Sequence, residues 1–342
     1  MNIQDIAREA GVSTATVSRV INNQSVRPDS RARVEAAIEK LHFVPNAFAR
    51  SLMSKRSKAI GTLITSMTNS YYMEITEVIE RRFRDQGSML FLCSTDGSHQ
   101  SEQDYIQDLA SRQVDGIIII DPSIENYSNG LFRSTARRLP LVLIHSWAEF
   151  SGLNAVTIDQ ELGMTRVMQR LWEDGHRDIA FVRGEVGHSY DIKENKWREF
   201  LAAKGCPPLA EHLVTITQGN TEEAIPLARD ACLALLERST PKRPSAIFAC
   251  NDLMALGAMA AANSLGIRIP EELSLIGHDN TAMTLTSNPP LSSVDLKMRS
   301  LGNAAVDLLL HAMNPEDPEP RRILIEPELV LRASSGKAPS VL

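Results

Sequence analysis

The chain has 342 residues, of which 43% are hydrophobic and 23% are charged. This composition is typical of a globular protein with more than one domain, and it excludes a disordered or fibrous chain. Apolar runs such as 117–120 are too short to span a bilayer, and the N-terminus lacks a secretory signal pattern. We therefore expect a cytoplasmic protein with no membrane partner, whose four scattered cysteines are reduced thiols.

Charge is distributed unevenly along the chain. Residues 1–58 hold ten Lys and Arg against five Asp and Glu, a net charge of +5, so the rest of the chain carries −11. A small basic segment joined to an acidic body indicates that only the segment contacts a polyanion such as DNA. A solvated basic helix face is the alternative explanation, and charge alone does not separate the two.

The first forty residues predict a small helical domain. Apolar residues at helical spacing over 3–10 predict one helix, and Gly11 ends it at a tight turn. Ser13 is a suitable N-cap for a second helix, and Pro28 starts a third whose apolar stripe completes the core. Two short helices joined by a glycine-containing turn predict a helix-turn-helix.

The outer face of the second helix is suited to DNA. Its side chains are short and polar apart from Arg19, so the helix can sit deep in the major groove while the arginine contacts a guanine. A helical hairpin packed into a core is the alternative, and the polar face argues against it. We expect base contacts from Thr14, Ala15 and Arg19, and phosphate contacts from Ser13, Asn22 and Lys55. Thr16 lies on the same face and is a further expected DNA contact.

A short segment that begins with Pro45 follows the third helix. It is only about two turns long, and a helix of that length is marginal in water unless something binds it. The basic and polar residues 55–58 continue from it as a linker.

The head carries two motifs at a fixed distance: Gly11-Val12-Ser13-x-x-Thr16-Val17-Ser18-Arg19-Val20-x-Asn22, and Pro45-Asn46-x-x-Ala49-Arg50-x-Leu52. Together they closely resemble the lac repressor (LacI/GalR) family. The resemblance implies that residues 46–53 fold as a hinge helix on operator DNA, where two such helices from a dimer enter the minor groove. It adds Asn46, Ala49, Arg50 and Leu52 to the expected DNA contacts.

The hinge expectation agrees with physical reasoning from the residues. A marginal helix can order on binding, and an apolar side chain such as Leu52 can wedge between base pairs and kink a flexible step. For Leu52 taken alone, packing within the linker is the alternative.

From residue 59 onward, short apolar runs alternate with helical patterns. Parallel sheets with helices on both faces are therefore expected, and so many strands fit two doubly wound lobes better than one sheet. The strands are expected at 60–65, 89–93, 116–120, 141–144, 156–158, 179–182, 214–217, 246–249 and 273–276. The helices are expected at 71–86, 101–112, 160–174, 194–204, 222–238, 252–265 and 299–312.

The family resemblance extends over this region, in segments 246–258, 269–280 and 289–294. It implies a two-lobed body of the periplasmic-binding-protein type, with an effector cleft between the lobes. The domain plan is a helix-turn-helix domain at 1–45, a hinge helix and linker at 46–58, and an effector-binding and dimerisation domain at 59–342. Its N-subdomain is expected at about 59–160 and 291–321, and its C-subdomain at about 161–290 and 322–342.

Effector contacts are expected beyond the carboxyl ends of the strands. The resemblance implies contacts from Asn251, Asp279, Tyr190 and the aromatic pair at 71–72. Where the family has an arginine followed three residues later by glycine, we assign Lys196 as its replacement, a point charge without the bidentate fork. The expected effector residues are Tyr71, Tyr72, Asp121, Trp147, Tyr190, Lys196, Asn251 and Asp279.

Several of these assignments have a plain structural alternative. Trp147 follows the fourth strand next to His145 and could stack on a sugar ring, and half-buried packing is the other interpretation. Asp121 and Asp159 each end a strand, where a carboxylate can equally cap the next helix. A sugar or sugar derivative is the effector hypothesis, because the cleft is polar and flanked by aromatic residues.

We therefore expect a sequence-specific regulator of transcription that binds a palindromic operator as a homodimer, located with the nucleoid. A repressor is favoured, with an activator or dual regulator as the alternative, and a solute-binding protein without a DNA role as a distant one. No catalytic motif is found, so no enzyme, metal or cofactor is expected.

Overall fold

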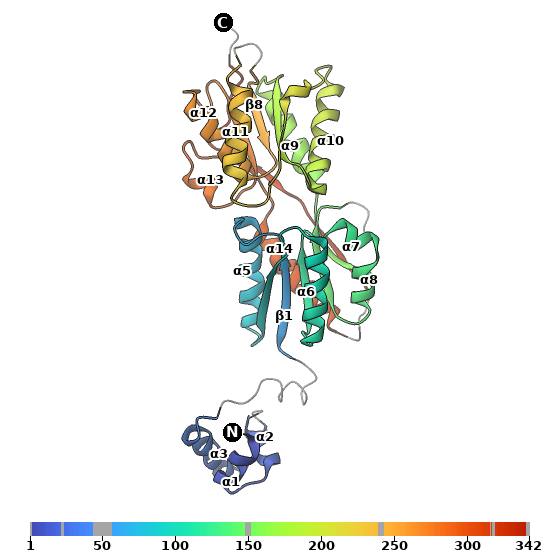
Figure 1. Cartoon of the computed structure of the whole chain (residues 1–342), viewed down its shortest axis with the longest axis vertical. Helices are drawn as coiled ribbons and strands as arrows, with labels where there is room; N and C mark the ends of the chain where they lie inside the picture. The colour runs from blue at the N-terminus through green and yellow to red at the C-terminus, as the bar shows by residue number, and fades with distance from the viewer. Residues whose placement is uncertain are drawn as a thin grey trace. The chain divides into compact units, whose positions relative to one another are not determined.

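The computed structural model describes residues 2–21, 24–43, 57–147, 152–238, 243–314, 316 and 319–339. The chain divides into two compact units (Figure 1). The first is Met1–Ala59 with Gln113–Asp115, and the second is Ile60–Arg112 with Gly116–Leu342. Each unit is described by itself.

The first unit contains the predicted helix-turn-helix. Asn2 caps the first helix by accepting from the backbone N–H groups of Gln4 and Asp5, and Gly11 ends it in the left-handed conformation at φ 64°. The Ser13 hydroxyl accepts from the Thr16 N–H at 3.2 Å, as expected for an N-cap. The helices are α1 (Ile3–Ala10), α2 (Thr14–Ile21) and α3 (Pro28–Lys40). Their core consists of Ile6, Ala7, Ala10, Val17, Val20, Val34 and Ala37.

The second unit is a body of two lobes, each built on a six-stranded sheet. The first sheet has the order β11-β5-β4-β3-β1-β2, and its strands are β1 (Ala59–Ile64), β2 (Met89–Ser94), β3 (Gly116–Ile120), β4 (Leu141–His145), β5 (Asn154–Ile158) and β11 (Arg322–Ile325). The helices of this lobe are α5 (Ser70–Arg84), α6 (His99–Ser111), α7 (Ile124–Ser128), α8 (Leu131–Ala136) and α14 (Met298–Ala312).

The second sheet has the order β12-β10-β9-β8-β6-β7. Its strands are β6 (Ile179–Gly184), β7 (Leu213–Ile216), β8 (Ala246–Ala249), β9 (Ser274–Asp279), β10 (Ser292–Asp295) and β12 (Glu328–Val330). The helices of this lobe are α9 (Gln160–Glu173), α10 (His188–Ala203), the short 3₁₀ turn η1 (Ala210–His212), α11 (Ala224–Leu236), α12 (Asp252–Ser264) and α13 (Met283–Thr286).

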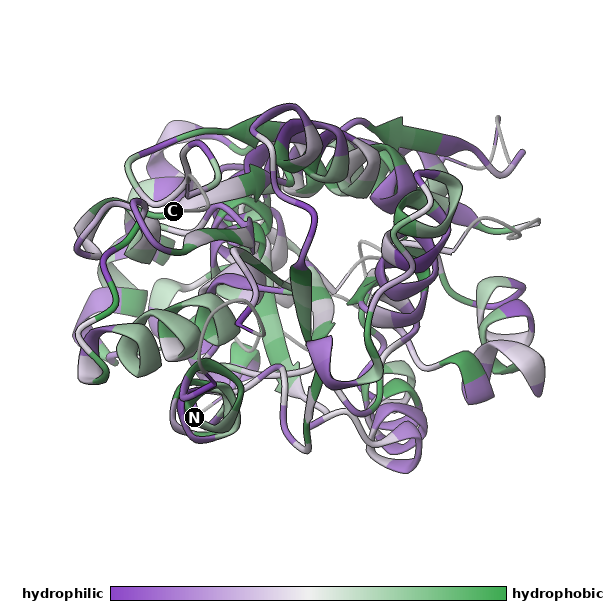
Figure 2. Ribbon diagram, turned by 90° about the horizontal axis from the view of Figure 1, so that it is seen from above, coloured by the Kyte–Doolittle hydropathy of each residue, from purple (hydrophilic) through white to green (hydrophobic). Residues whose placement is uncertain are grey.

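The pattern of hydrophobic residues explains this architecture. β3 and β4 are buried along their whole length, because helices cover both faces of a parallel sheet. Seen from above, hydrophobic strands lie in the middle of the body, and the helices around them contain both hydrophilic and hydrophobic residues (Figure 2). None of the helices in the described part of the chain has the length and apolarity needed to cross a bilayer.

Two boundaries between the lobes differ from those expected. The first lobe was expected to resume at about residue 291, yet β10, which ends at Asp295, pairs in parallel with β9 in the second sheet, so this crossing lies about five residues later. The second lobe was expected to resume at about residue 322, yet β11, which ends at Ile325, pairs in parallel with β5 in the first sheet, so this crossing lies about four residues later. The chain therefore crosses between the lobes after β5, after β10 and after β11. Strands of four residues with mixed polarity give little sequence signal, so these crossings were misplaced.

Candidate functional site

The recognition surface of the first unit is the outer face of α2. The exposed residues here are Ser13, Thr14, Ala15 and Arg19. Thr16 is half-buried, and its hydroxyl lies 3.0 Å from that of Ser13. Arg19 forms no ion pair with any other described residue, so its guanidinium is available to a ligand. The expected contacts Asn22, Asn46, Ala49, Arg50, Leu52 and Lys55, and the hinge segment 46–53, lie outside the described residues.

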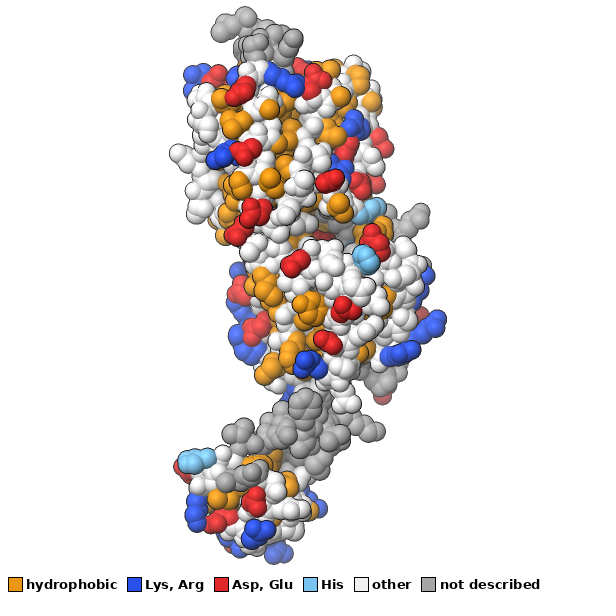
Figure 3. Space-filling view, viewed as in Figure 1, with side chains coloured by type: hydrophobic (Ala, Val, Ile, Leu, Met, Phe, Trp, Pro, Cys, Tyr) orange, Lys and Arg blue, Asp and Glu red, His pale blue; other side chains and the backbone are white. Residues whose placement is uncertain are grey.

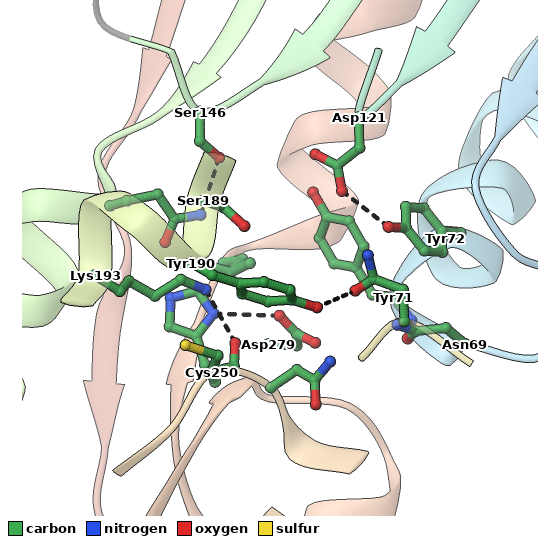
Figure 4. Close-up of a pocket in the computed structure, with 15 residues that line it drawn as sticks. Asn69, Tyr71, Tyr72, Asp121, Ser146, Ser189, Tyr190, Lys193, Cys250 and Asp279 are labelled. Atoms are coloured by element: carbon green, nitrogen blue, oxygen red, sulfur yellow. Dashed lines mark hydrogen bonds and ion pairs between the residues drawn. The ribbon is translucent and has the colours of Figure 1, made fainter. Parts of the chain in front are cut away.

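The second candidate site is a pocket between the two lobes of the body (Figure 4). Its walls come from the carboxyl ends of strands in both sheets and from the first turns of α5 and α10, as expected for doubly wound sheets. The free volume inside is small, about 30 Å³. The lining residues are Asn69, Tyr71, Tyr72, Asp121, Ser146, Gln160, Ser189, Tyr190, Lys193, Asn220, Cys250, Asn251, His278, Asp279 and Leu296.

Lys193 is the cation of this pocket. The residue is only 2% exposed, and its Nζ atom donates to the carbonyl of Cys250 at 3.0 Å. The ammonium also lies 5.6 Å from the centre of the Tyr190 ring, within range of a cation–π contact. Lys193 and Tyr190 enter the pocket together, across from Tyr71, Tyr72 and Asp121 (Figure 4).

Lys196, which the sequence assigned to this role, lies outside the pocket. It pairs with Glu161 at 3.0 Å and with Glu199 at 3.4 Å on the surface of α10. Three residues carry a side chain about 4.5 Å along a helix, and the pocket is at the N-terminal end of α10, so the earlier lysine reaches it. The sequence therefore predicted a lysine of α10 in the pocket, but it assigned the lysine one helical turn too far along the helix.

Two carboxyl groups accompany Lys193: Asp279 is buried and Asp121 is half-buried. Burial raises the pKa of Asp121, and this is partly offset by the Tyr72 hydroxyl, which donates to its Oδ2 at 3.0 Å, and by Lys193. Burial and repulsion from Asp252 raise the pKa of Asp279 well above its usual range, with Lys193 acting in the opposite direction. Burial thus favours the protonated form of each carboxyl group, in which it can donate to a ligand as well as accept from it.

Tyr190 is seated in a slot made of glycines. A Cβ added at Gly184 or Gly187 would come within 2.6 or 2.7 Å of the tyrosine ring, and one at Gly219 would come within 2.7 Å of its hydroxyl. The hydroxyl donates to Asn220 Oδ1 at 2.6 Å. Backbone without side chains is needed here so that the ring can lie flat against it.

Asn251 lies on the pocket wall but already has two structural partners. Its Oδ1 accepts from the Met254 N–H at 2.9 Å, which caps α12, and its Nδ2 donates to the Gly219 carbonyl at 2.6 Å. The capping alternative also holds for Asp159, whose Oδ1 accepts from the Leu162 N–H at 2.9 Å. It does not hold for Asp121, because Ser123 caps the helix that follows.

Trp147 does not line the pocket. It is half-buried and packs in an aromatic group with Tyr127, His145 and His188, at ring distances of 5.6, 5.0 and 6.2 Å. Its backbone N–H donates to His145 Nδ1 at 3.0 Å. The packing alternative therefore describes this tryptophan.

Gln160 and His278 are pocket residues that the sequence did not single out. The Gln160 side chain donates to Ser146 Oγ at 3.0 Å, while its Oε1 is buried without a partner among the described residues. His278 Nδ1 lies 3.2 Å from Asp279 Oδ1, and its Nε2 likewise has no partner in the described structure. A buried polar atom without a partner costs about 1–3 kcal/mol, so these two atoms are suited to contact a ligand. Their position in the sequence could have identified these two residues, because each is adjacent to an aspartate at the end of a strand.

The buried histidine at the end of β4 predicts a pH dependence of stability. Burial, with Arg322 and His188 adding to it, lowers the pKa of His145 to about 3. Between pH of about 6.5 and 3 the unfolded chain binds a proton at this residue and the native protein does not. The contribution of the neutral His145 to the free energy of unfolding is therefore complete above about pH 6.5. It is lost as the pH falls, at about 1.4 kcal/mol per pH unit.

We expect His145→Asn to weaken this dependence. Between pH 7.5 and 5, the fall in the free energy of unfolding should be smaller than in the wild type by about 2 kcal/mol. Urea denaturation at the two pH values measures the difference. An unchanged pH dependence in the variant would show that His145 does not remain neutral in the fold.

Comparison with known proteins decides the family. Residues 2–46 match the family described as "Bacterial regulatory proteins, lacI family", and residues 168–335 match "Periplasmic binding protein-like domain". The HTH-type transcriptional repressor PurR of Aliivibrio fischeri is 33% identical over 334 residues, which cover 97% of each chain. The chain belongs to the lacI family. PurR of Vibrio cholerae is also 33% identical, over 96% of each chain.

Solved structures agree with this assignment. The lac repressor dimer bound to operator and the anti-inducer ONPF matches with a TM-score of 0.84 and 25% identity, over 98% of this chain and 99% of that one. The transcriptional regulator CelR–cellobiose complex matches with a TM-score of 0.70 and 25% identity, over 98% of this chain and all of that one. The predicted family and fold class are confirmed, and this lacI-family chain is a DNA-binding regulator of transcription with an effector-binding body.

Proposed function

We propose that this regulator is a homodimeric repressor that binds a palindromic operator and is controlled by a small effector in the pocket between the lobes. One observation carries the proposal: a helix with a free arginine on its DNA-facing side and a pocket of buried charged groups occur in the same chain. Two heads on one operator require two chains. The matched lac repressor structure is a dimer on operator, which supports this assembly.

The hinge belongs to the same proposal. Residues 46–53 order on the operator, Leu52 enters the minor groove at its centre, and residues 46–58 join the head at 1–45 to the body. The protein then acts in the cytoplasm, on the nucleoid. A reporter gene behind the target promoter, measured with and without this regulator, separates repression from activation.

The effector class that the pocket fits best is a sugar or sugar derivative without an acidic group. The carboxyl groups of Asp121 and Asp279 and the Lys193 ammonium offer both acceptors and donors to ligand hydroxyls. Gln160 Oε1 and His278 Nε2 add two more polar atoms that need partners. The CelR structure contains cellobiose, which supports a carbohydrate in this fold. A phosphorylated ligand fits less well, because Lys193 is the one Lys or Arg among the described lining residues and two carboxyl groups lie beside it.

Effector binding changes the arrangement of the lobes. Pockets for small ligands enclose about 300–1,000 Å³, far more than the roughly 30 Å³ free here, so a sugar must move the pocket walls apart. Three crossings join the lobes beside this pocket, and a change in their relative position alters the spacing of the two hinge segments in a dimer. A coupling free energy of about 1–3 kcal/mol gives a 5- to 150-fold change in operator affinity.

A ligand screen tests the effector class. Melting temperatures of the full chain are measured with neutral sugars, nucleobases and amino acids, each at the same concentration. The proposal expects at least one sugar to raise the melting temperature, since a ligand that binds only the native state stabilises it. Stabilisation by nucleobases or amino acids alone would overturn the sugar assignment, but it would not contradict the proposed DNA-binding regulator.

The recognition helix gives a separate prediction. Arg19→Ala removes one contact to a base edge, and we expect operator affinity to fall by about 1–3 kcal/mol with relaxed preference at one base pair of each half-site. Competition binding against operators altered at each position measures it. Glu39→Ala, on the exposed part of α3, is the control. Wild-type affinity and specificity in Arg19→Ala would contradict the assigned recognition face.

A further inference from the structure

The arginines at one end of the first lobe have no obvious structural role. Arg112 follows α6 and precedes β3, and Arg137 and Arg138 follow α8 and precede β4. β1, β3 and β4 are parallel neighbours, so their first residues lie at the same edge of the sheet. β1 begins at Ala59, directly after the linker from the DNA-binding unit. We call Arg112, Arg137 and Arg138 the linker-edge arginines.

These three side chains are exposed and form no ion pair with any described residue. Asp108 lies one helical turn before Arg112, yet the two side chains are not paired. Asp115, also close by in the sequence, is occupied by the linker, because its carboxylate accepts from the backbone N–H groups of Ser57 and Lys58 at 2.7 and 2.8 Å. Figure 3 shows Lys and Arg side chains gathered on the lobe over the region where Figure 1 places α8.

The preference of basic residues for helix C-termini does not explain this set. The second lobe has the same architecture, and basic residues lie at the corresponding edge, but there they have partners. Arg238 pairs with Glu211, and Arg243 and Arg268 both pair with Glu272. Arg177 and Lys204 lie over the ring of Trp172. The described part of the chain therefore keeps unpaired arginines at the linker edge of the first lobe.

We propose that the linker-edge arginines bind phosphates of the DNA that flanks each operator half-site. Residues 59–342 carry a net charge of −11, so a body brought close to DNA by its linker is repelled unless its nearest surface is basic. Exposed arginines are well suited to contact phosphates, and such contacts are independent of sequence. The body thus adds affinity and orientation to the specificity of the head. This inference rests on the DNA-binding function and not on the identity of the effector.

The test is the salt dependence of DNA binding. The triple variant Arg112→Gln, Arg137→Gln, Arg138→Gln is compared with wild type on a random-sequence duplex longer than the operator, by fluorescence anisotropy over a range of KCl concentrations. Removal of one phosphate contact lowers the slope of log affinity against log salt by about 0.9. The control variant Arg229→Gln, Arg238→Gln, Arg268→Gln removes the same charge from the surface of the second lobe. Melting temperatures show whether both variants fold.

The proposal expects a smaller slope for the linker-edge variant only, and restoration of the wild-type slope when the three positions are lysine. Equal slopes for the linker-edge and control variants would overturn it, and the surface would then face an acidic protein or no partner. A wild-type chain that binds no duplex at all would instead contradict the proposed function of the head. The two failures are therefore distinguishable.

Discussion

Replacing Lys193 with Met is expected to abolish the response to effector while leaving operator binding without effector intact. The side chain is buried, and its ammonium stabilises the ionised forms of Asp121 and Asp279. Methionine keeps the apolar stem but removes the charge, so the pKa of both carboxyl groups rises further and the ligand loses a donor. Loss of one partner from a buried charged group costs about 2–5 kcal/mol, and we expect effector affinity to fall roughly 100-fold or more.

Lys196→Met is the matched control for this experiment. It removes the same charge one turn later on α10, where the lysine pairs with two exposed glutamates. Calorimetric titration with the sugar that stabilises the wild type most should show nearly normal affinity for Lys196→Met. If Lys196→Met lost binding and Lys193→Met retained it, the site assigned from the structure would be wrong and the sequence-based assignment right.

Replacing Trp197 with Ala is expected to cause the largest loss of stability. Its side chain is fully buried, its ring stacks on Phe181 at 5.3 Å, and its Nε1 donates to the Ile179 carbonyl at 3.1 Å. Truncation leaves a large cavity between α10 and the sheet and an unpaired carbonyl. Substitutions of buried tryptophan by alanine cost about 3–5 kcal/mol, and urea denaturation of the body measures the loss.

Trp172→Ala is the control in the same lobe. Trp172 is half-buried at the edge of the core, and the Arg177 guanidinium lies over its ring at 3.7 Å. We expect a loss of about 1 kcal/mol, because mainly surface packing and a cation–π contact are removed. Similar losses in the two variants would show that α10 does not pack on the sheet as described.

The order of helices and strands was largely predictable from the sequence. The first helix of the head has the predicted bounds, because Asn2 and Gly11 mark its ends through local chemistry. β3 and β8 also have the predicted bounds, since a strand buried on both faces is a continuous apolar run. These signals are local, so they can be read without knowing the neighbours.

The strands at the lobe crossings were not predictable in the same way. β10, β11 and β12 have three or four residues each and contain serine, arginine or glutamate. Their place is decided by the strands they pair with, and a short polar strand carries no period that identifies its sheet. The boundary of the lobes was misplaced for this reason.

Six of the eight residues predicted to contact the effector line the pocket, but the position of its lysine was not predicted. Tyr71, Tyr72, Asp121, Tyr190, Asn251 and Asp279 all line it, and Lys196 and Trp147 do not. Which lysine of α10 enters the pocket depends on where the helix begins, and the helix starts at His188, six residues before the expected start. The lining by Gln160 and His278 depends on contacts between lobes that no local pattern reveals.

The most direct test of the central claim is a selection of bound sequences from random duplex DNA with the purified full-length protein. A dimer with two helix-turn-helix heads predicts a palindrome whose half-sites lie about 34–36 Å apart between centres, with a flexible step in the middle. The selection is repeated with the stabilising sugar added, which should change the enrichment. Enrichment of a single, non-repeated site, or of none in either condition, would contradict a dimeric, effector-controlled repressor.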